Sequence, residues 1–243
     1  MCIRDSYTIT DQTTTSANIT TRPLDVTGIT VFGLTVNNKI YDGTTTAPLD
    51  TSNISYSGLV AGDDFTGTYS GVFADANVGT GKTVTITSSY GGTDVNNYTI
   101  TDQASTTADV TAKALTATAS ASNKTYDGTT TATTTLTFSG LVGSETLGQT
   151  VGSTFNNKNV GTGKTVTVNS ITLADGTGLA ANYSISPGQT TTADVTAKSL
   201  TVSGITASNK TYDATTTATL NTGSVTYTGL VSGDVFNGTY TGA

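Results

Sequence analysis

Hydrophobic and polar residues alternate along several segments of the chain. In residues 82–87, Val84 and Ile86 fall on one face and threonines on the other, and the alternation returns around Val166 and Val168. Successive side chains of a β-strand point to opposite faces of the sheet, so this pattern predicts half-buried antiparallel strands. Short clusters rich in Gly, Asp and Asn separate these segments, which favours many short strands joined by turns.

The best-defined stretch predicts strands near residues 114–121, 130–139, 146–155, 163–172 and 181–196, the last broken into two. Threonine is the commonest residue, and its β-branched side chain favours extended backbone over helix. The expected core of this stretch consists of Tyr126, Leu136, Phe138, Val142, Leu147, Phe155, Val166, Val168, Ile171, Tyr183, Ile185 and Val195.

One phrase occurs three times along the chain. Its copies read Asn38-Lys-Ile-Tyr-Asp-Gly-Thr-Thr-Thr-Ala, Asn123-Lys-Thr-Tyr-Asp-Gly-Thr-Thr-Thr-Ala and Asn209-Lys-Thr-Tyr-Asp-Ala-Thr-Thr-Thr-Ala. The tyrosines at 41, 126 and 212 give spacings of 85 and 86 residues. Such a period is too long for a solenoid turn and suits a small domain copied in tandem.

Other landmarks recur in the same order around that phrase. They define complete repeats at 22–112 and 113–197, the tail of a preceding repeat at 7–21, and the N-terminal half of a further repeat at 198–243. Residues 1–6 break the pattern and are interpreted as a non-native scar. We expect 198–243 to be poorly ordered in isolation, because half a sandwich leaves an apolar face and strand edges exposed. The landmarks are Ser57-Gly-Leu-Val with Ser139 and Thr228, Val78-Gly-Thr-Gly-Lys with Val160, Asn97-Tyr with Asn182, and Ala108-Asp-Val-Thr-Ala-Lys with Ala193.

The strand count predicts the fold class of each repeat. About six or seven short strands in about 85 residues indicate an all-β protein made of tandem immunoglobulin-like β-sandwich repeats. A parallel β-helix is the alternative, although no inner period of about 20–25 residues is visible. Low-complexity disorder is the other alternative, and the 35% hydrophobic content with its alternation opposes it.

Composition narrows the possible functions. The net charge of −7, with only 10 Lys plus Arg, disfavours binding to nucleic acids and to anionic membranes. No apolar run approaches the length of a membrane-spanning helix, so we expect no membrane insertion in this segment. Histidine is absent and Cys2 is the single cysteine. We therefore expect neither a Ser-His-Asp catalytic site nor a disulfide, and predict that the protein is not an enzyme and holds no cofactor.

Two motifs invite a ligand-binding interpretation. The Gly-Thr-Gly-Lys-Thr segments at 79 and 161 resemble the end of a phosphate-binding loop, but the required earlier Gly is replaced by Ala76 and Lys158. We interpret these segments as hairpin turns. Asp42, Asp127 and Asp213 follow the repeated tyrosines and could contribute to a calcium site. Tyr-Asp-Gly-Thr is also an ordinary turn signature, and because Ala214 replaces Gly after Asp213, a positive φ is not expected to be essential there.

The repeated tyrosines are predicted to have structural roles in the core or at its corners, with stacking on sugars as the alternative. The expected signature residues are Tyr41, Asp42, Gly43, Tyr126, Asp127, Gly128, Tyr212 and Asp213, together with Tyr98 and Tyr183 of the Asn-Tyr segments.

The Asn-Lys-Thr-Tyr-Asp-Gly-Thr-Thr-Thr-Ala phrase, with Gly-Leu-Val after it and Asn-Tyr near the end, resembles the YDG-type repeats of large bacterial surface proteins. Those repeats occur in filamentous-haemagglutinin-like adhesins, beside bacterial immunoglobulin-like modules. The resemblance covers nearly all of residues 7–243 and departs from the phrase at Ala214. It implies a secreted or surface-anchored protein, associated with the outer membrane of a Gram-negative bacterium, that supports adhesion or biofilm formation.

Two roles for the repeats follow from this resemblance. The first is a structural stalk that holds a binding tip away from the cell. The second is a set of weak modules that bind a host glycan, a matrix protein or other cells, and gain avidity from their number. The segments that differ most between repeats, 60–75 and 142–157, are where a binding surface would be expected.

Overall fold

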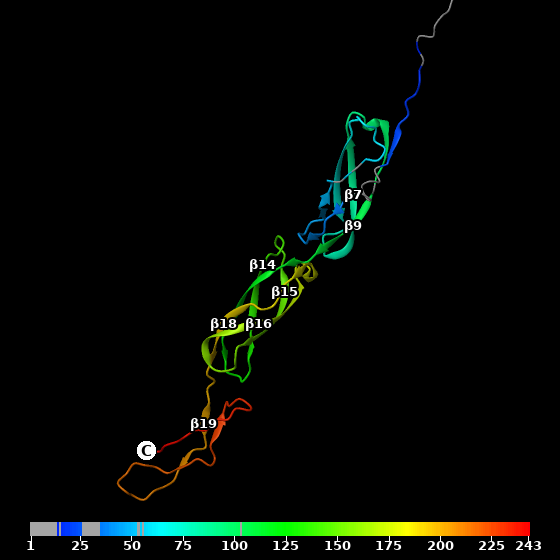
Figure 1. Ribbon diagram of the computed structural model, residues 1–243. Coiled ribbons are helices and arrows are strands. Elements are labelled where there is room, and N and C mark those ends of the chain that lie inside the picture. The colour runs from blue at the N-terminus through cyan, green and yellow to red at the C-terminus, as the bar shows by residue number, and fades with distance from the viewer. Residues whose placement is uncertain (1–13, 15, 26–34, 53, 55, 103) are drawn as a thin grey trace, which may run out of the picture. The chain divides into compact units, whose positions relative to one another are not determined.

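The computed structural model describes residues 14, 16–25, 35–52, 54, 56–102 and 104–243. The expected scar at 1–6 lies outside the described residues, as do residues 7–13 and 15 of the expected preceding tail. The chain divides into two compact units, Met1–Thr111 and Ala112–Ala243. The described part is all-β: it contains strands, two single-turn 3₁₀ helices and no α-helix (Figure 1).

The first unit is built around one five-stranded sheet with the strand order β3-β9-β7-β6-β4. Strand β7 lies at its centre, paired antiparallel with both β6 and β9. Two small strand pairs accompany the sheet: β1–β8, which is parallel, and β2–β5, which is antiparallel. Its elements are β1 (Arg22–Asp25), β2 (Thr35–Val36), β3 (Lys39–Ile40), β4 (Thr46–Ala47), β5 (Leu49–Asp50), β6 (Thr66–Phe73), β7 (Gly79–Gly91), η1 (Val95–Asn97), β8 (Tyr98–Thr101) and β9 (Ser105–Thr111).

The second unit repeats this plan and then continues into a third segment. Its large sheet has the order β12-β18-β16-β15-β13, with the pairs β10–β17 and β11–β14 beside it. The elements of residues 113–197 are β10 (Lys113–Ala114), β11 (Thr116–Ala121), β12 (Lys124–Thr125), β13 (Thr131–Ala132), β14 (Thr134–Ser139), β15 (Leu147–Phe155), β16 (Gly161–Asp175), η2 (Ala180–Asn182), β17 (Tyr183–Ser184) and β18 (Thr190–Thr196). The third segment contains β19 (Thr201–Ser203), β20 (Thr206–Ala207), β21 (Leu220–Asn221) and β22 (Thr226–Thr228).

The strands of repeat 113–197 run nearly around a closed ring. Strand β14 lies beside β15 and β11 beside β18, so the strand order β11, β14, β15, β16, β18 comes back close to β11. The antiparallel β15–β16 and β16–β18 pairings show that the parallel β-helix alternative is wrong. The all-β prediction is confirmed, whereas the immunoglobulin-like sandwich stays a prediction because the sheets share edges in this barrel-like arrangement.

The expected strands of this repeat are confirmed. Each predicted range contains one or two observed strands, and the break expected within 181–196 separates β17 from β18. The short strand β12 was not expected. It forms because the backbone of Lys124 and Thr125 pairs with Val195 and Thr196 of β18. Partners about seventy residues away are invisible in a local pattern.

The core of repeat 113–197 is largely the expected one. Leu136, Phe155, Val166, Val168, Tyr183 and Val195 are buried, as predicted. Tyr126, Phe138, Val142, Leu147, Ile171 and Ile185 are half-buried instead. For Leu147 and Ile171 the cause is the sheet itself, because β18 pairs with β16 only as far as Thr167. The distal end of β16 is therefore not covered by β18.

The first unit fills the corresponding space with aromatic side chains. Phe65, Ile86 and Tyr98 are buried, and Tyr56 and Tyr90 pack against them. The rings of Tyr56 and Phe65 meet edge to face with centroids 4.9 Å apart, a favourable arrangement of two π-systems.

Candidate functional site

The lysine of the repeated phrase folds over the turn that follows it. Lys39 donates its ammonium protons to the carbonyl oxygens of Thr44 at 2.8 Å and Thr46 at 3.0 Å. It also forms an ion pair of 2.7 Å with Asp42, although its own side chain is only 8% exposed. The ammonium group therefore binds three oxygen acceptors of the turn.

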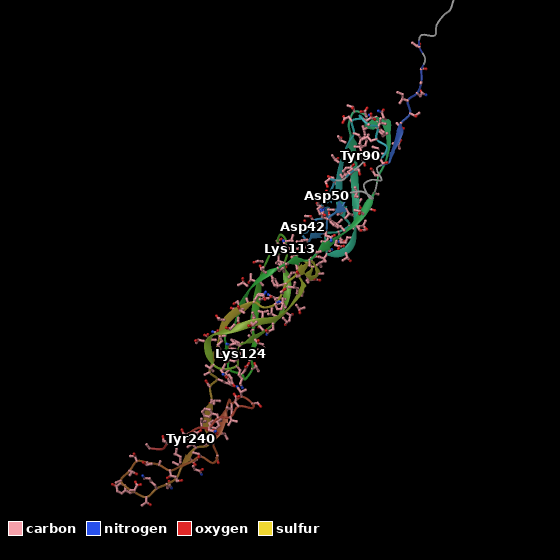
Figure 2. All side chains as sticks on the ribbon, in the orientation of Figure 1. Asp42, Asp50, Tyr90, Lys113, Lys124 and Tyr240 are labelled. Carbon is pink, nitrogen blue, oxygen red and sulfur yellow. The ribbon has the colours of Figure 1, made fainter. Side chains whose placement is uncertain are left out.

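The other two copies of the phrase form the same turn. Lys124 pairs with Asp127 at 2.7 Å and donates to the carbonyl of Thr129 at 2.9 Å (Lys124 is labelled in Figure 2). Lys210 pairs with Asp213 at 2.7 Å. Because all three distances are equal, the phrase specifies a local structure that forms in each copy.

The aspartates expected as calcium ligands lie in these turns. One carboxylate oxygen of Asp42 accepts from the backbone N–H and the hydroxyl of Thr44, both at 2.8 Å, as well as from Lys39. In Asp127, the hydrogen bond from Lys124 and then those from Thr129 lower the pKa to about 2. This carboxylate oxygen of Asp127 is thus bound to the Lys124 ammonium group. Calcium binding stays an untested prediction. The described residues contain no cluster of three or more His, Cys, Asp or Glu that could hold a metal ion.

A second set of hydrogen bonds joins the phrase to the rest of its repeat. The side-chain oxygen of Asn38 accepts from the backbone N–H of Asp109 at 2.9 Å, and the Asp109 carboxylate accepts from the N–H of Gly81 at 2.7 Å. Asn123, Asp194 and Gly163 form the same chain in the next repeat. These residues belong to recurring segments of the sequence, but no contact between them was predicted, although their equal spacing in both repeats indicates one.

The Gly-Thr-Gly-Lys segments lie in hairpin connections, as predicted, because the β6–β7 pairing ends at Phe73 and Val84 and the β15–β16 pairing ends at Phe155 and Val166. The segments also form the first residues of β7 and β16, which pair there with β9 and β18. The register of that pairing shifts between Gly79 and Lys82 and between Gly161 and Lys164. The segments are β-bulges, for which a glycine in the left-handed region, here Gly81 with φ 58°, is usual.

The lysine of each bulge holds the preceding turn. Lys82 forms an ion pair of 2.5 Å with Asp75, and Lys164 donates to the side chain of Asn157 at 2.6 Å. A lysine that would bind phosphate in a nucleotide site is here bound to its own loop.

The tyrosines of the Asn-Tyr segments tie two distant parts of each repeat together. The Tyr98 hydroxyl accepts from the N–H of Val60 at 3.1 Å and donates to Asp63. The Tyr183 hydroxyl likewise accepts from Val142 and donates to Glu145. Burial and then this carboxylate raise the pKa of Tyr183. These contacts fix the Gly-Leu-Val loop against the end of its own repeat.

The tyrosines of the phrase have three different environments. Tyr41 is 5% exposed and Tyr212 is 91% exposed. Tyr126 is half-buried against the core of its repeat. The tyrosine of the phrase is therefore a core residue in the first copy but not in the third.

The residue after the phrase's aspartate has the same backbone conformation in all three copies. Gly43 has φ 77°, Gly128 φ 81° and Ala214 φ 57°. Among the described residues other than glycine, Ala214 alone has a positive φ. The expectation drawn from Ala214 was thus wrong: the alanine adopts the left-handed conformation, at a cost of about 1–2 kcal/mol, because the turn requires it.

Two hollows lie near residues named in the sequence analysis. The first, of about 310 Å³, lies on β6 and β7 and is lined by Tyr69 and by hydroxyl-bearing side chains. Its lining residue Ser88 carries a buried hydroxyl oxygen with no hydrogen-bond partner in the protein. The second, of about 320 Å³, lies where repeat 113–197 meets the third segment, and its lining includes Tyr126 and Asp234.

A family model described as the YDG domain matches residues 20–108, 111–193 and 196–243. The three matched segments each contain one copy of the Lys–Asp turn. No curated protein and no solved structure matches the chain. Within the part of the chain that the structure describes, no helix has the length and apolar character needed to cross a membrane.

Proposed function

Because the chain belongs to the YDG domain family, we propose that its repeats are structural spacers of a secreted or cell-surface bacterial adhesin. Each repeat is an immunoglobulin-like β-sandwich unit, and tandem copies hold a binding tip away from the outer membrane of the cell. In this role the repeats have no catalytic residues and no cofactor.

The observation that supports this proposal is where the repeated side chains make their contacts. In repeat 113–197, Asn123 bonds to the backbone of Asp194, and Lys124 bonds to the turn through Asp127 and Thr129. Tyr183 bonds to the loop residue Val142. Residues that recur because they bind a ligand would present polar groups to solvent, whereas these are used to hold the repeat together.

The surface of the repeats suits a spacer. Along β7, Val84 and Ile86 are buried while Thr83, Thr85 and Thr87 are exposed. A hydroxyl-rich surface with a net charge of −7 resists self-association between copies held close together.

A second candidate function is weak binding of glycans by the repeats themselves. The observation that favours it is the hollow on β6 and β7, whose lining includes the hydroxyl-bearing residues Thr68, Ser70 and Thr87. Hydroxyl groups can exchange hydrogen bonds with the hydroxyls of a sugar ring. This hollow lies partly in the divergent segment 60–75, where a binding surface was expected.

The experiment that separates the two functions is a binding assay of the whole chain on host cells and immobilised glycans, with folding checked by circular dichroism. A spacer gives no saturable binding. Saturable binding that is lost in a Ser70→Lys, Thr87→Lys double variant, but kept in Thr165→Lys on the other repeat, would replace the spacer proposal with the glycan one. All three altered positions are exposed, so the variants are expected to fold.

A further inference from the structure

The turn of the repeated phrase in repeat 113–197 contacts the third segment. The Tyr126 hydroxyl donates to a carboxylate oxygen of Asp234 at 2.7 Å. The other oxygen of Asp234 lies 3.4 Å from the ammonium of Lys158. That ammonium also lies over the Tyr126 ring, 5.9 Å from its centroid. Two residues of one repeat, from separate loops, therefore bind a single carboxylate of the next.

The shapes of the two surfaces match at the same place. Gly128 follows the phrase's aspartate, and a Cβ atom built on it would lie only 2.7 Å from a methyl carbon of Val231. Real Cβ atoms are not found at that distance, so no other residue fits without displacing Val231. The backbone angle of this position thus favours glycine, and the approach of Val231 leaves no room for a side chain.

The carboxylate involved occupies an equivalent position in every repeat. Asp234 lies at the position of Asp63 and Glu145, three residues after the valine of Gly-Leu-Val. Asp63 and Glu145 accept hydrogen bonds from Tyr98 and Tyr183 of their own repeats. A carboxylate has two oxygens and about four acceptor positions, so one carboxylate can bind a tyrosine of its own repeat and one of its neighbour.

We propose that the Tyr-Asp-Gly turn is a docking surface whose partner is the Gly-Leu-Val loop of the following YDG repeat. We call the contact of Tyr126, Gly128 and Lys158 with Val231 and Asp234 the repeat joint. It rests on the proposed spacer function and deepens it, because a specific contact restricts the bending between successive repeats. The aspartate of the phrase then serves its own turn, while the tyrosine and the glycine serve the joint.

We expect the joint to exchange between a closed and an open state. Beside its polar contacts lies the cavity of about 320 Å³, lined by apolar side chains that include Val160, Leu230 and Phe236. Loss of one hydrogen bond from such a contact raises its open population roughly two- to tenfold.

The test is nuclear magnetic resonance of the whole chain. In the native chain we expect a nuclear Overhauser effect between the Val231 methyl protons and the Gly128 Hα protons. Tyr126→Phe keeps the ring and removes the hydroxyl, and it should weaken this signal. Tyr212→Phe is the matched control, because the same phrase position is 91% exposed there, and it should leave the signal unchanged.

Asp234→Asn provides a second variant that leaves repeat 113–197 intact, in case Tyr126→Phe disturbs the core against which the ring packs. The joint is disproved if the native chain lacks the signal, or if neither Tyr126→Phe nor Asp234→Asn weakens it. Such a result leaves the spacer function standing as a flexible tether. Saturable glycan binding would remove the spacer function while the joint remains, so the two failures can be told apart.

Discussion

Repeat 113–197 and segment 198–243 begin with nearly the same sequence and reach different degrees of structure. The Lys–Asp ion pair of the phrase is 2.7 Å in both. Repeat 113–197 buries Phe155, Val166 and Val195, whereas no residue of 198–243 is buried. The comparison separates two levels of folding: the phrase specifies its own turn by local hydrogen bonds, but burial requires strands equivalent to β16 and β18, which 198–243 does not contain.

The largest expected difference between the two regions is in amide hydrogen exchange. Core amides of repeat 113–197, such as those of β16, should exchange about 100-fold or more slowly than amides in 201–221, because exchange there requires opening of a packed sheet. Within the third segment, the docked residues 229–234 should exchange up to about tenfold more slowly than 201–221. Mass spectrometry of peptides from the whole chain measures both. Strong protection throughout 198–243 would show that its turns and short strands suffice for a stable fold.

Truncation of a valine to alanine should have very different effects on stability in the two regions. Val166 is fully buried, so Val166→Ala should destabilise repeat 113–197 by about 2–4 kcal/mol through lost burial and the cavity it leaves. Val235 is 86% exposed, and Val235→Ala should change the free energy of unfolding by less than about 0.5 kcal/mol. Urea unfolding followed by the methyl resonances of each region provides the comparison. Equal effects would mean that burial is not what distinguishes them.

Removal of the phrase's lysine is expected to have an intermediate effect. Lys124 is 16% exposed at its side chain and donates to the carbonyls of Thr129 and Thr131. Lys124→Met keeps the aliphatic stem and leaves these oxygens unpaired, so repeat 113–197 should lose about 1–2 kcal/mol of stability. Lys210→Met in the third segment is the matched control, and urea unfolding of repeat 113–197 should not detect it. An effect of Lys210→Met on that repeat as large as that of Lys124→Met would contradict the local role of the turn.

Much of the strand arrangement of the repeats was predictable, because alternation of Val and Thr fixes both the strands and the face that each residue occupies. Which strands pair with one another was harder to predict. The Gly-Thr-Gly segment at Gly79 was predicted to lie in a hairpin, but its second pairing, with β9, which makes it a bulge, could not be predicted from the local sequence. The φ angle of Ala214 was predicted wrongly because the residue type indicates only which conformations are preferred. The turn held by the Lys210–Asp213 ion pair places Ala214 in the left-handed region in spite of that preference.

The hydrogen-bond partners of the signature residues could not be derived from one repeat alone. The carboxylate that binds Tyr126 lies 108 residues further along the chain, in a different repeat. Asn38 and Asp109 stand in two recurring segments, but their contact with each other was not predicted, because they meet only through the pairing of β3 with β9. Long-range polar contacts of this kind leave no local periodicity in the sequence.

The smallest expected effect concerns the acid stability of the same turn. The pKa of Asp127 is held at about 2 in the folded protein, chiefly by Lys124, against an ordinary value of 3.8. A depressed pKa means that the carboxylate stabilises the fold above about pH 4 and that this contribution disappears as the pH falls from 4 to 2. The native chain should therefore be more stable than Asp127→Asn at pH 6, and the two should converge near pH 2. Urea unfolding of repeat 113–197 at four or five pH values measures the gap, with Asp213→Asn as the control that leaves this repeat unchanged. A gap that stays constant down to pH 2 would show that the charge of Asp127 does not contribute, and that the turn is held by Thr129 and the lysine–carbonyl bonds alone.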